Sequence, residues 1–289
     1  MNVIRVTPRG FCLGVVKSIK IARETVKKYP DKKIYMIGKI VHNDIIVKEF
    51  IDLGVILLDD RNESRLNLVS KLESGSVVIF SAHGTDSKVI NQSEKNGLIV
   101  VDTKCEWVLK TEELINDYLK NNWSVIFVGK NSHPETIALT SISEKITLIT
   151  SANEVNDLNV IENSKIIVTN QTTLSKIDTE FIFKAIKEKY PKALIKNDLC
   201  DATLERQEAV LKLNQSEVDL LLVVGDKKSN NSNKLVEIGT KKGIKSLLIQ
   251  SKSDIKPEIL RNIKNVAVTA GASTPSFIQL DVIKFLENY

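Results

Sequence analysis

Short apolar runs alternate with helix-patterned segments along the whole chain, and this alternation limits the possible folds more than any other feature. The apolar runs span residues 3–6, 34–37, 55–58, 77–80, 99–101, 125–128, 146–149, 166–168, 220–224, 246–249 and 266–268. Helical periodicity lies between them, for example in residues 15–29, 106–121, 175–190, 203–215 and 273–288. Such short and continuously apolar strands are typical of parallel sheets that helices cover on both faces. The sequence therefore predicts an α/β protein.

Length and composition limit the possible functions. The chain has 289 residues with 42% hydrophobic and 27% charged content, which is ordinary for a globular protein. Its apolar runs are too short to span a membrane, and residues 1–10 lack the features of a signal peptide. We therefore expect a cytoplasmic protein without a membrane partner. A net charge of +5 with only 5% aromatic residues suits an anionic small molecule and argues against a nucleic-acid partner.

The three cysteines recur at nearly equal spacing. Cys12, Cys105 and Cys200 are separated by 105−12 = 93 and 200−105 = 95 residues. Their odd number and wide separation argue against a disulfide framework. Two further kinds of loop follow apolar runs in the same order after each cysteine. In the first kind, a glycine and a polar turn follow the last apolar residue, at residues 37–43, 128–135 and 224–233. In the second kind, small polar residues follow it, at residues 80–84, 168–173 and 268–273.

This threefold recurrence predicts three pseudo-equivalent α/β domains. Ligands of parallel sheets lie at the carboxyl ends of the strands, and every one of these loops follows a predicted strand. Three such domains facing one centre would bring the three cysteines together. We place the domains at residues 13–104, 105–199 and 200–289, with residues 1–12 joining the third. The simpler alternative, one doubly wound sheet with scattered thiols, leaves the recurrence unexplained.

Three convergent thiolates can hold a metal group. They suit a tetrahedral zinc ion or an iron-sulfur cluster. A closed structural site would need a fourth protein ligand, whereas a cubane cluster with three cysteines keeps one iron open. Cys12 directly precedes a predicted helix, whose positive N-terminal end favours a thiolate. The alternative is three unrelated buried thiols.

The histidines of the chain lie in the same kinds of loop. His42, His83 and His133 all follow predicted strands. Imidazoles that converge on one cavity with Lys39 and Lys130 would bind an anion such as a phosphate. A histidine with a purely structural role is the alternative for each position taken alone.

Two further segments carry candidate site residues. Residues 229–232, with the sequence Ser-Asn-Asn-Ser, open a predicted helix, where backbone N–H groups favour a phosphate. An ordinary N-cap would explain the same residues. Glu135 begins another predicted helix and is a candidate proton donor, hydrogen-bonded through Thr172 of a facing loop. A first-turn carboxylate that the helix dipole stabilises is the alternative for Glu135.

As a set, these motifs resemble the 4-hydroxy-3-methylbut-2-enyl diphosphate reductases, the IspH/LytB family of iron-sulfur enzymes. The resemblance covers essentially the whole chain and rests on residues 8–12, 41–43, 81–84, 102–105, 133–135, 171–173, 200–203, 229–233 and 269–273. It implies a trefoil of three α/β domains with parallel sheets around a central 4Fe-4S cluster. The cluster would be held by Cys12, Cys105 and Cys200 and would keep one open iron.

The resemblance also implies the last step of the non-mevalonate isoprenoid pathway. Two electrons and two protons would remove the allylic hydroxyl of (E)-4-hydroxy-3-methylbut-2-enyl diphosphate as water, giving isopentenyl and dimethylallyl diphosphate. An external donor such as ferredoxin or flavodoxin would supply the electrons. The hydroxyl would bind the open iron, and Glu135 with Thr172 would deliver the proton. His133 would be the third catalytic residue. The residues implied to contact the substrate are His42, His83, His133, Thr172, Ser229, Asn230, Asn231 and Ser273.

The chain departs from the usual family pattern next to two cysteines and in the Ser-Asn segment. The departing residues are Lys104, Glu106, Asp201 and Asn230. Those beside the cysteines would change the local charge of the cluster, and Asn230 would alter one diphosphate contact. Two other functions stay open. One is another three-cysteine iron-sulfur enzyme, such as a dehydratase or a synthase, and the other is a non-enzymatic metal-binding or electron-transfer protein.

Overall fold

The computed structural model describes residues 1–159 and 165–289, which form two compact units. Unit 1 consists of Met1–Leu13, His42–Asp44 and Cys200–Tyr289, and unit 2 of Gly14–Val41 and Ile45–Leu199. The described strands form three four-stranded sheets, and every strand pairing is parallel. The predicted α/β class is therefore confirmed. Within the described ranges, no helix has the length and apolar character needed to cross a membrane.

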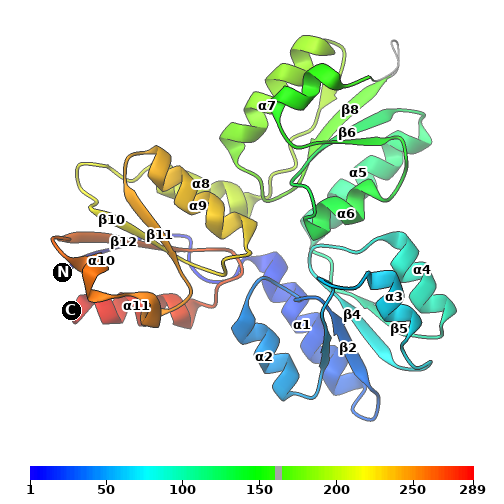
Figure 1. Ribbon diagram of the computed structural model, residues 1–289, viewed down its shortest axis with the longest axis horizontal. Helices are drawn as coiled ribbons and strands as arrows, with labels where there is room; N and C mark the ends of the chain where they lie inside the picture. Colours follow the sequence, from blue (N-terminus) through cyan, green and yellow to red (C-terminus); the bar gives the residue numbers. More distant parts are fainter. Residues whose placement is uncertain (160–164) are drawn as a thin grey trace. The chain divides into compact units, whose positions relative to one another are not determined.

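Unit 1 contains one sheet with helices on both faces (Figure 1). Its strands are β1 (Asn2–Arg5), β10 (Leu220–Val224), β11 (Lys245–Ile249) and β12 (Asn265–Ala270), in the order β1-β12-β10-β11. The helices are α8 (Asp201–Leu211), α9 (Asn230–Lys241), η2 (Lys252–Asp254), α10 (Pro257–Leu260) and α11 (Ser276–Glu287). Alternate residues of β10 explain this layering. Leu220 and Leu222 pack in a core with α10 and α11, whereas Leu221 and Val223 pack in a second core with α8 and α9.

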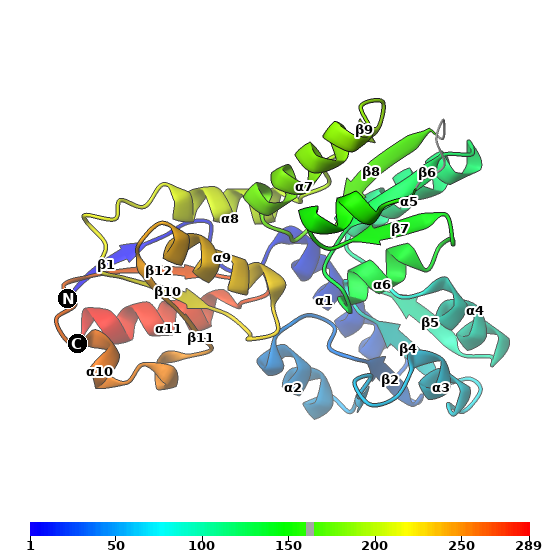
Figure 2. The same ribbon diagram turned by 45° about the horizontal axis from the view of Figure 1, so that its top comes forward.

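Unit 2 contains the other two sheets (Figures 1 and 2). The strands of the first are β2 (Ile34–Ile37), β3 (Ile56–Leu58), β4 (Val77–Phe80) and β5 (Ile99–Asp102), in the order β3-β2-β4-β5. Its helices are α1 (Leu13–Lys28), α2 (Asp44–Asp52), α3 (Arg65–Ser70) and α4 (Ser87–Lys95). Helices α3 and α4 pack together with one face of the sheet around Phe80 and Val69. Figure 1 shows α1 and α2 on the opposite side.

The second sheet of unit 2 has the same layered construction. Its strands are β6 (Ser124–Val128), β7 (Ile146–Ile149), β8 (Ile166–Asn170) and β9 (Leu194–Ile195), in the order β7-β6-β8-β9. Its helices are α5 (Glu106–Lys120), α6 (Pro134–Thr140), η1 (Ala152–Asp157) and α7 (Lys176–Lys189). Phe127 of β6 packs with α5 and α6, whereas its neighbours Ile126 and Val128 pack with η1 and α7. This alternation is the reason why the strand is apolar throughout.

One strand order is repeated in all three sheets. In corresponding order they are β3-β2-β4-β5, β7-β6-β8-β9 and β11-β10-β12-β1. The fourth place belongs to β5, β9 and β1, and the next cysteine along the chain is Cys105, Cys200 or Cys12, respectively. Strand β1 thus completes a sheet whose other strands come from the far end of the chain. This equivalence supports the threefold recurrence, while the domain boundaries stay a prediction.

A few elements were not predicted from the sequence or begin at other residues than predicted. Strand β9 has two residues and pairs through Leu194 and Ile195 with β8, and a run this short has no recognisable apolar pattern. Helix α8 begins at Asp201, directly after Cys200, and not at residue 203. Helix α11 begins at Ser276 and not at residue 273, because residues 271–274 form a turn after β12.

Candidate active site

Glu135 and Thr172 of unit 2 form a buried hydrogen-bonded pair. Glu135 is the second residue of α6, which follows β6, and Thr172 lies in the loop after β8, the neighbouring strand. The backbone N–H of Thr172 donates to Glu135 Oε1 at 2.7 Å, and its hydroxyl donates to Oε2 at 3.1 Å. The two side chains are 1% and 3% exposed. The pairing of these two residues is the one expected from the sequence.

Burial sets the protonation of Glu135. Loss of solvent is the largest effect and raises the pKa of Glu135 to about 7, while the two hydrogen bonds from Thr172 act in the opposite direction. The charge of Asp198 adds a smaller upward shift of the pKa. A carboxyl group with this pKa can hold a proton at neutral pH and release it, as a general acid requires.

His133 and His83 lie beside this pair. His133 is the N-cap of α6, and its Nδ1 atom accepts a hydrogen bond of 3.2 Å from the backbone N–H of Glu135. This contact places the ring proton of neutral His133 on Nε2. The rings of His83 and His133 meet edge to face with their centroids 5.5 Å apart. Unit 2 therefore gathers two of the three histidines next to the candidate proton donor.

Gln171 was not singled out from the sequence, although it precedes Thr172 in the quoted motif. It is fully buried, and its Oε1 atom accepts a hydrogen bond of 2.9 Å from the backbone N–H of Lys130. Its Nε2 atom donates to Thr173 Oγ1 at 3.1 Å. Gln171 thereby links the loop after β6 to the loop after β8, which are the loops that carry Glu135 and Thr172. Its role depends on burial and on the backbone group that it meets, which the sequence alone does not show.

Cys105 is the third predicted site feature of unit 2. It is the N-cap of α5, and its backbone N–H donates to the carbonyl oxygen of Ala82 at 2.9 Å. This bond ties the cysteine to the loop that carries His83. The cysteine side chain is partly buried, and no disulfide forms among the described cysteines. Cys105 thus lies at a helix N-terminus, where a thiolate is favoured.

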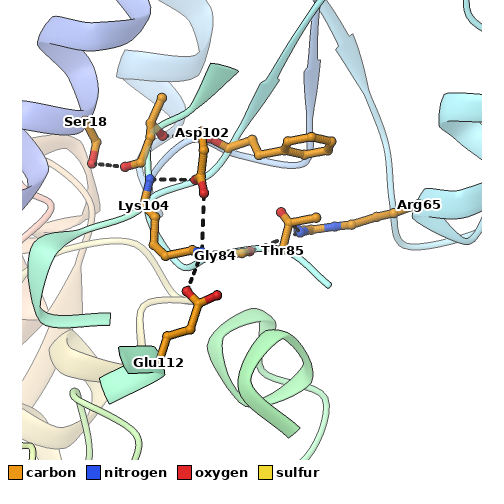
Figure 3. A network of polar contacts seen from close by, with 9 residues as sticks. Ser18, Arg65, Gly84, Thr85, Asp102, Lys104 and Glu112 are labelled. Carbon is orange, nitrogen blue, oxygen red and sulfur yellow. Dashed lines mark hydrogen bonds and ion pairs between the residues drawn. The ribbon is translucent and has the colours of Figure 1, made fainter. Parts of the chain in front are cut away.

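Lys104, one of the departures from the family pattern, is paired with two carboxylates (Figure 3). Its Nζ atom lies 2.5 Å from Glu112 Oε2 and 3.3 Å from Asp102 Oδ2. Burial would lower the pKa of Lys104, but the hydrogen bond and charge of Glu112, together with Asp102, outweigh it and raise the pKa. The neighbouring Glu106 is exposed and lies 3.8 Å from Lys17. The positive charge of Lys104 is therefore offset locally.

In unit 1, His42 and Ser273 lie in loops that are joined directly. The Ser273 hydroxyl donates to the His42 carbonyl oxygen at 3.1 Å, and the Asn43 side chain donates to the Ser273 carbonyl oxygen at 3.0 Å. Asn43 and Ser273 are 7% and 8% exposed. Two of the predicted diphosphate residues are thus brought together by Asn43, whose role the sequence reading did not identify.

The Ser-Asn segment forms the N-terminus of α9 in unit 1. Ser229 is the N-cap, and Asn230 and Asn231 are the first two helical residues. All three are at least 95% buried. Neither polar atom of the Asn231 side chain has a hydrogen-bond partner. A buried amide without a partner at a helix N-terminus fits an anionic ligand, because the ligand would supply the missing acceptor.

Ser232 lies close to the loops after β10 and β12. A Cβ atom at Gly225 would lie 2.2 Å from Ser232 Oγ, and one at Gly271 would lie 2.0 Å from it. Both glycines therefore leave room for this serine. The contact brings the Ser229–Asn231 segment and the Ser273 loop to the same edge of the sheet, although the structure gives no direct contact between their side chains.

Cys12 and Cys200 belong to unit 1. The backbone N–H of Cys12 donates to the Ala272 carbonyl oxygen at 3.0 Å, and Cys200 Sγ lies 3.1 Å from Thr203 Oγ1. Both cysteines directly precede a helix. In the described part of the chain, no three His, Cys, Asp or Glu side chains are placed to hold a single metal ion. The convergence of the two thiols with Cys105 stays a prediction.

Comparison with known proteins identifies relatives along the whole chain. The sequence pattern of the family described as LytB protein matches residues 3–287. The 4-hydroxy-3-methylbut-2-enyl diphosphate reductase of Malacoplasma penetrans is 45% identical over 292 residues, which cover 99% of this chain and 97% of the relative. The protein of the same name from Symbiobacterium thermophilum is 42% identical over 293 residues, covering 100% of this chain and 98% of the relative.

A solved structure leads to the same family. The E-1-hydroxy-2-methyl-but-2-enyl-4-diphosphate reductase from Plasmodium falciparum is similar to this chain with a TM-score of 0.91 and 31% sequence identity. The match covers 99% of this chain and 88% of that protein. Family pattern, sequence relatives and fold therefore agree over nearly the full length. The chain is an oxidoreductase and belongs to the LytB protein family.

Proposed function

We propose that this enzyme reductively dehydroxylates (E)-4-hydroxy-3-methylbut-2-enyl diphosphate to isopentenyl and dimethylallyl diphosphate. The C–O bond to the allylic hydroxyl breaks, and the hydroxyl leaves as water with one proton. An external electron donor supplies two electrons, and these and a second proton form the new C–H bond. The buried Glu135–Thr172 pair is the observation that carries this proposal. The reaction needs a group that holds a proton near neutral pH, gives it to the substrate and takes up another.

An iron-sulfur cluster held by Cys12, Cys105 and Cys200 is part of the proposal. The donor set fits such a group: each cysteine follows the fourth strand of a sheet and precedes a helix N-terminus that favours a thiolate. When bound, the cluster would pass on the two electrons of the external donor and provide a Lewis-acidic iron for the hydroxyl. This chemistry leaves binding, orientation and proton transfer to the side chains of the chain.

Glu135 would deliver the proton to the departing hydroxyl. Its burial holds the proton at neutral pH, and the two hydrogen bonds from Thr172 fix the orientation of the carboxyl group. His133 would donate from Nε2, because its Nδ1 atom already accepts the backbone N–H of Glu135. The three residues therefore provide an oriented acid beside a second hydrogen-bond donor.

The diphosphate would be held by the polar loops of unit 1. The amide of Asn231 lacks a partner, and Ser229 and Asn230 directly precede it at the positive N-terminus of α9. The loops of His42 and Ser273 are held together by two hydrogen bonds. With His83 of unit 2, these residues make up the proposed diphosphate-binding set. Asn230 keeps a hydrogen-bonding side chain at its position, although the family pattern has a serine there.

Anaerobic turnover tests the proposal. The protein is purified without oxygen and analysed for iron and acid-labile sulfide. It is then incubated with the hydroxylated allylic diphosphate and a chemical reductant. We expect iron and sulfide in similar amounts and the formation of both isoprenoid diphosphates. Zinc without sulfide would contradict the cluster, and an intact cluster without turnover would favour another iron-sulfur function.

A further inference from the structure

A buried arginine lies between the segments that carry two of the proposed cluster ligands. Arg206 of α8 is 2% exposed. Its Nη2 atom donates to the carbonyl oxygen of Gly10 at 2.8 Å, and its Nη1 atom donates to the carbonyl oxygen of Ala202 at 3.0 Å. Gly10 stands two residues before Cys12, and Ala202 two residues after Cys200. One guanidinium group therefore joins the backbones of the two cysteine segments.

The conformation of the Cys12 loop depends on a glycine at this contact. Gly10 has a φ of +75°, in the region that favours glycine, and a Cβ atom there would lie 2.1 Å from Ser276 Oγ. The carbonyl oxygen of Gly10 is therefore held in one orientation by the turn and by Arg206 together. This constraint applies two residues before the thiol, so it bears directly on where Cys12 can place its sulfur atom.

The charge of Arg206 is the second part of the argument. Both of its hydrogen-bond acceptors are backbone carbonyls, and its buried Nε atom has no hydrogen-bond partner. Burial lowers the pKa of Arg206, while the charges of Cys12 and Cys200 raise it. The charge of Glu205 raises the pKa by a smaller amount. A guanidinium nevertheless stays protonated in proteins. A buried cation needs a negative counterpart. Among the charged groups, the two cysteines raise the pKa of Arg206 the most.

Lys104 provides a contrast within unit 2. It is a partly buried cation next to a cysteine, but its charge is offset by Glu112 and Asp102 (Figure 3). Arg206 has carbonyl acceptors and therefore retains a positive charge, which interacts with the two cysteines of unit 1. Reduction adds negative charge to a cluster, and nearby positive charge and hydrogen bonding raise its potential.

We propose that Arg206 is a positioning residue for the iron-sulfur cluster, which fixes the Cys12 loop against α8 and favours the reduced state of the cluster through its positive charge. The inference rests on the proposed function, because it assumes that Cys12 and Cys200 are cluster ligands. It assigns to Arg206 two separable effects. The two-pronged hydrogen bonding determines how well the cluster is retained, and the charge determines its reduction potential.

Three variants separate these effects. Arg206→Lys keeps the charge and loses the planar fork, whereas Arg206→Gln loses the charge and keeps a donor. Arg261→Gln is the matched control, because it removes the same charge from an exposed residue. Arg261 lies where β12 begins, whereas the contact of Arg206 with Gly10 lies beyond the end of β1. Each variant is prepared anaerobically. Iron and sulfide per chain are measured. The reduction potential is determined by a redox titration that is monitored by electron paramagnetic resonance. Folding is checked by thermal unfolding of the cluster-free protein.

We expect Arg206→Gln to have a more negative potential than the unmodified protein, Arg206→Lys and Arg261→Gln. Arg206→Lys should keep the potential but retain less iron through repeated desalting, because it cannot bond to both carbonyls in the same way. Equal potentials in the Gln variant and the unmodified protein would overturn the proposal. A shifted potential in the Lys variant would also overturn it, and this readout remains if the Gln variant does not fold. Absence of a cluster from the unmodified protein would instead contradict the proposed function.

Discussion

Two glutamates of unit 2 accept the same pair of hydrogen bonds, and their acidities move in opposite directions. Glu135 accepts the backbone N–H and the hydroxyl of Thr172, and Glu154 accepts the backbone N–H and the hydroxyl of Thr150. Glu135 is buried and its pKa is raised to about 7. Glu154 is partly exposed, and the hydrogen bonds from Thr150 lower its pKa. Solvent access, and not the hydrogen-bonding motif, decides which carboxyl group can hold a proton at neutral pH.

The largest expected difference between the two glutamates is in catalysis. Glu135→Gln should lower turnover by roughly 10²- to 10⁴-fold, because a positioned general acid contributes that much and glutamine has no proton to give. Glu154→Gln, which makes the same chemical change at a partly exposed site, should leave turnover unchanged. The measurement is single-turnover formation of the isoprenoid diphosphates by protein with equal cluster content. Similar rates for both variants would remove Glu135 from proton delivery.

The second difference is in the dependence of stability on pH. The native pKa of Glu135 is raised from 4.5 to about 7, so the native state binds the proton more tightly than the unfolded state does. Its contribution to stability is fully present below pH 4.5 and is lost as the pH rises towards about 7. This loss should be on the order of 3 kcal/mol. Glu154 has a lowered pKa and should contribute stability that is lost only as the pH falls below 4.5.

Chemical denaturation of the cluster-free protein between pH 4 and 8 measures both contributions, as the free energy of unfolding relative to each Gln variant. Effects of other groups cancel in these differences if they act independently. The difference between the unmodified protein and Glu135→Gln should decrease with rising pH, and the difference for Glu154→Gln should be flat above pH 5. A flat difference for Glu135→Gln would mean that burial does not raise its pKa.

The smallest effects concern the threonine hydroxyls. Thr172→Val keeps the backbone N–H and the shape of the side chain but removes one hydrogen bond that lowers the pKa of Glu135. The alkaline limb of the pH–rate profile should therefore move to higher pH, and the native state should lose about 1 kcal/mol. Thr150→Val should raise the pKa of Glu154 without altering the pH–rate profile. If Thr172→Val does not shift the pH–rate profile, Glu135 is not the titrating group.

Much of the fold could be predicted from local patterns. Continuous apolar runs such as residues 220–224 and 125–128 indicated strands buried on both faces, and each proved to separate two helical layers. Strand β9 escaped prediction because two residues carry no periodicity, and it forms through pairing with β8. The place of β1 in the third sheet depends on pairing with β12, which lies more than 250 residues away in the sequence. Only the recurrence of the cysteines suggested that residues 1–12 join the third domain.

Candidate site residues could be chosen from the sequence wherever chemistry and loop position coincided. Glu135 and Thr172 lie in motifs that follow adjacent strands, so their pairing could be expected. Gln171, Asn43 and Arg206 could not be singled out, because amides and arginines are frequent in any sequence. Their importance depends on burial and on which backbone groups they meet.

The sequence by itself determined the α/β class, the repeated order of cysteine and strand-end loops, and the residue types available for chemistry. Tertiary structure decided what those residue types can do. Burial raised the pKa of Glu135 where solvent left that of Glu154 low, and two carboxylates offset the charge of Lys104 while Arg206 kept carbonyl partners. The physical reason is that protonation and charge depend on the local dielectric and on neighbouring groups, which packing brings together from distant parts of the chain.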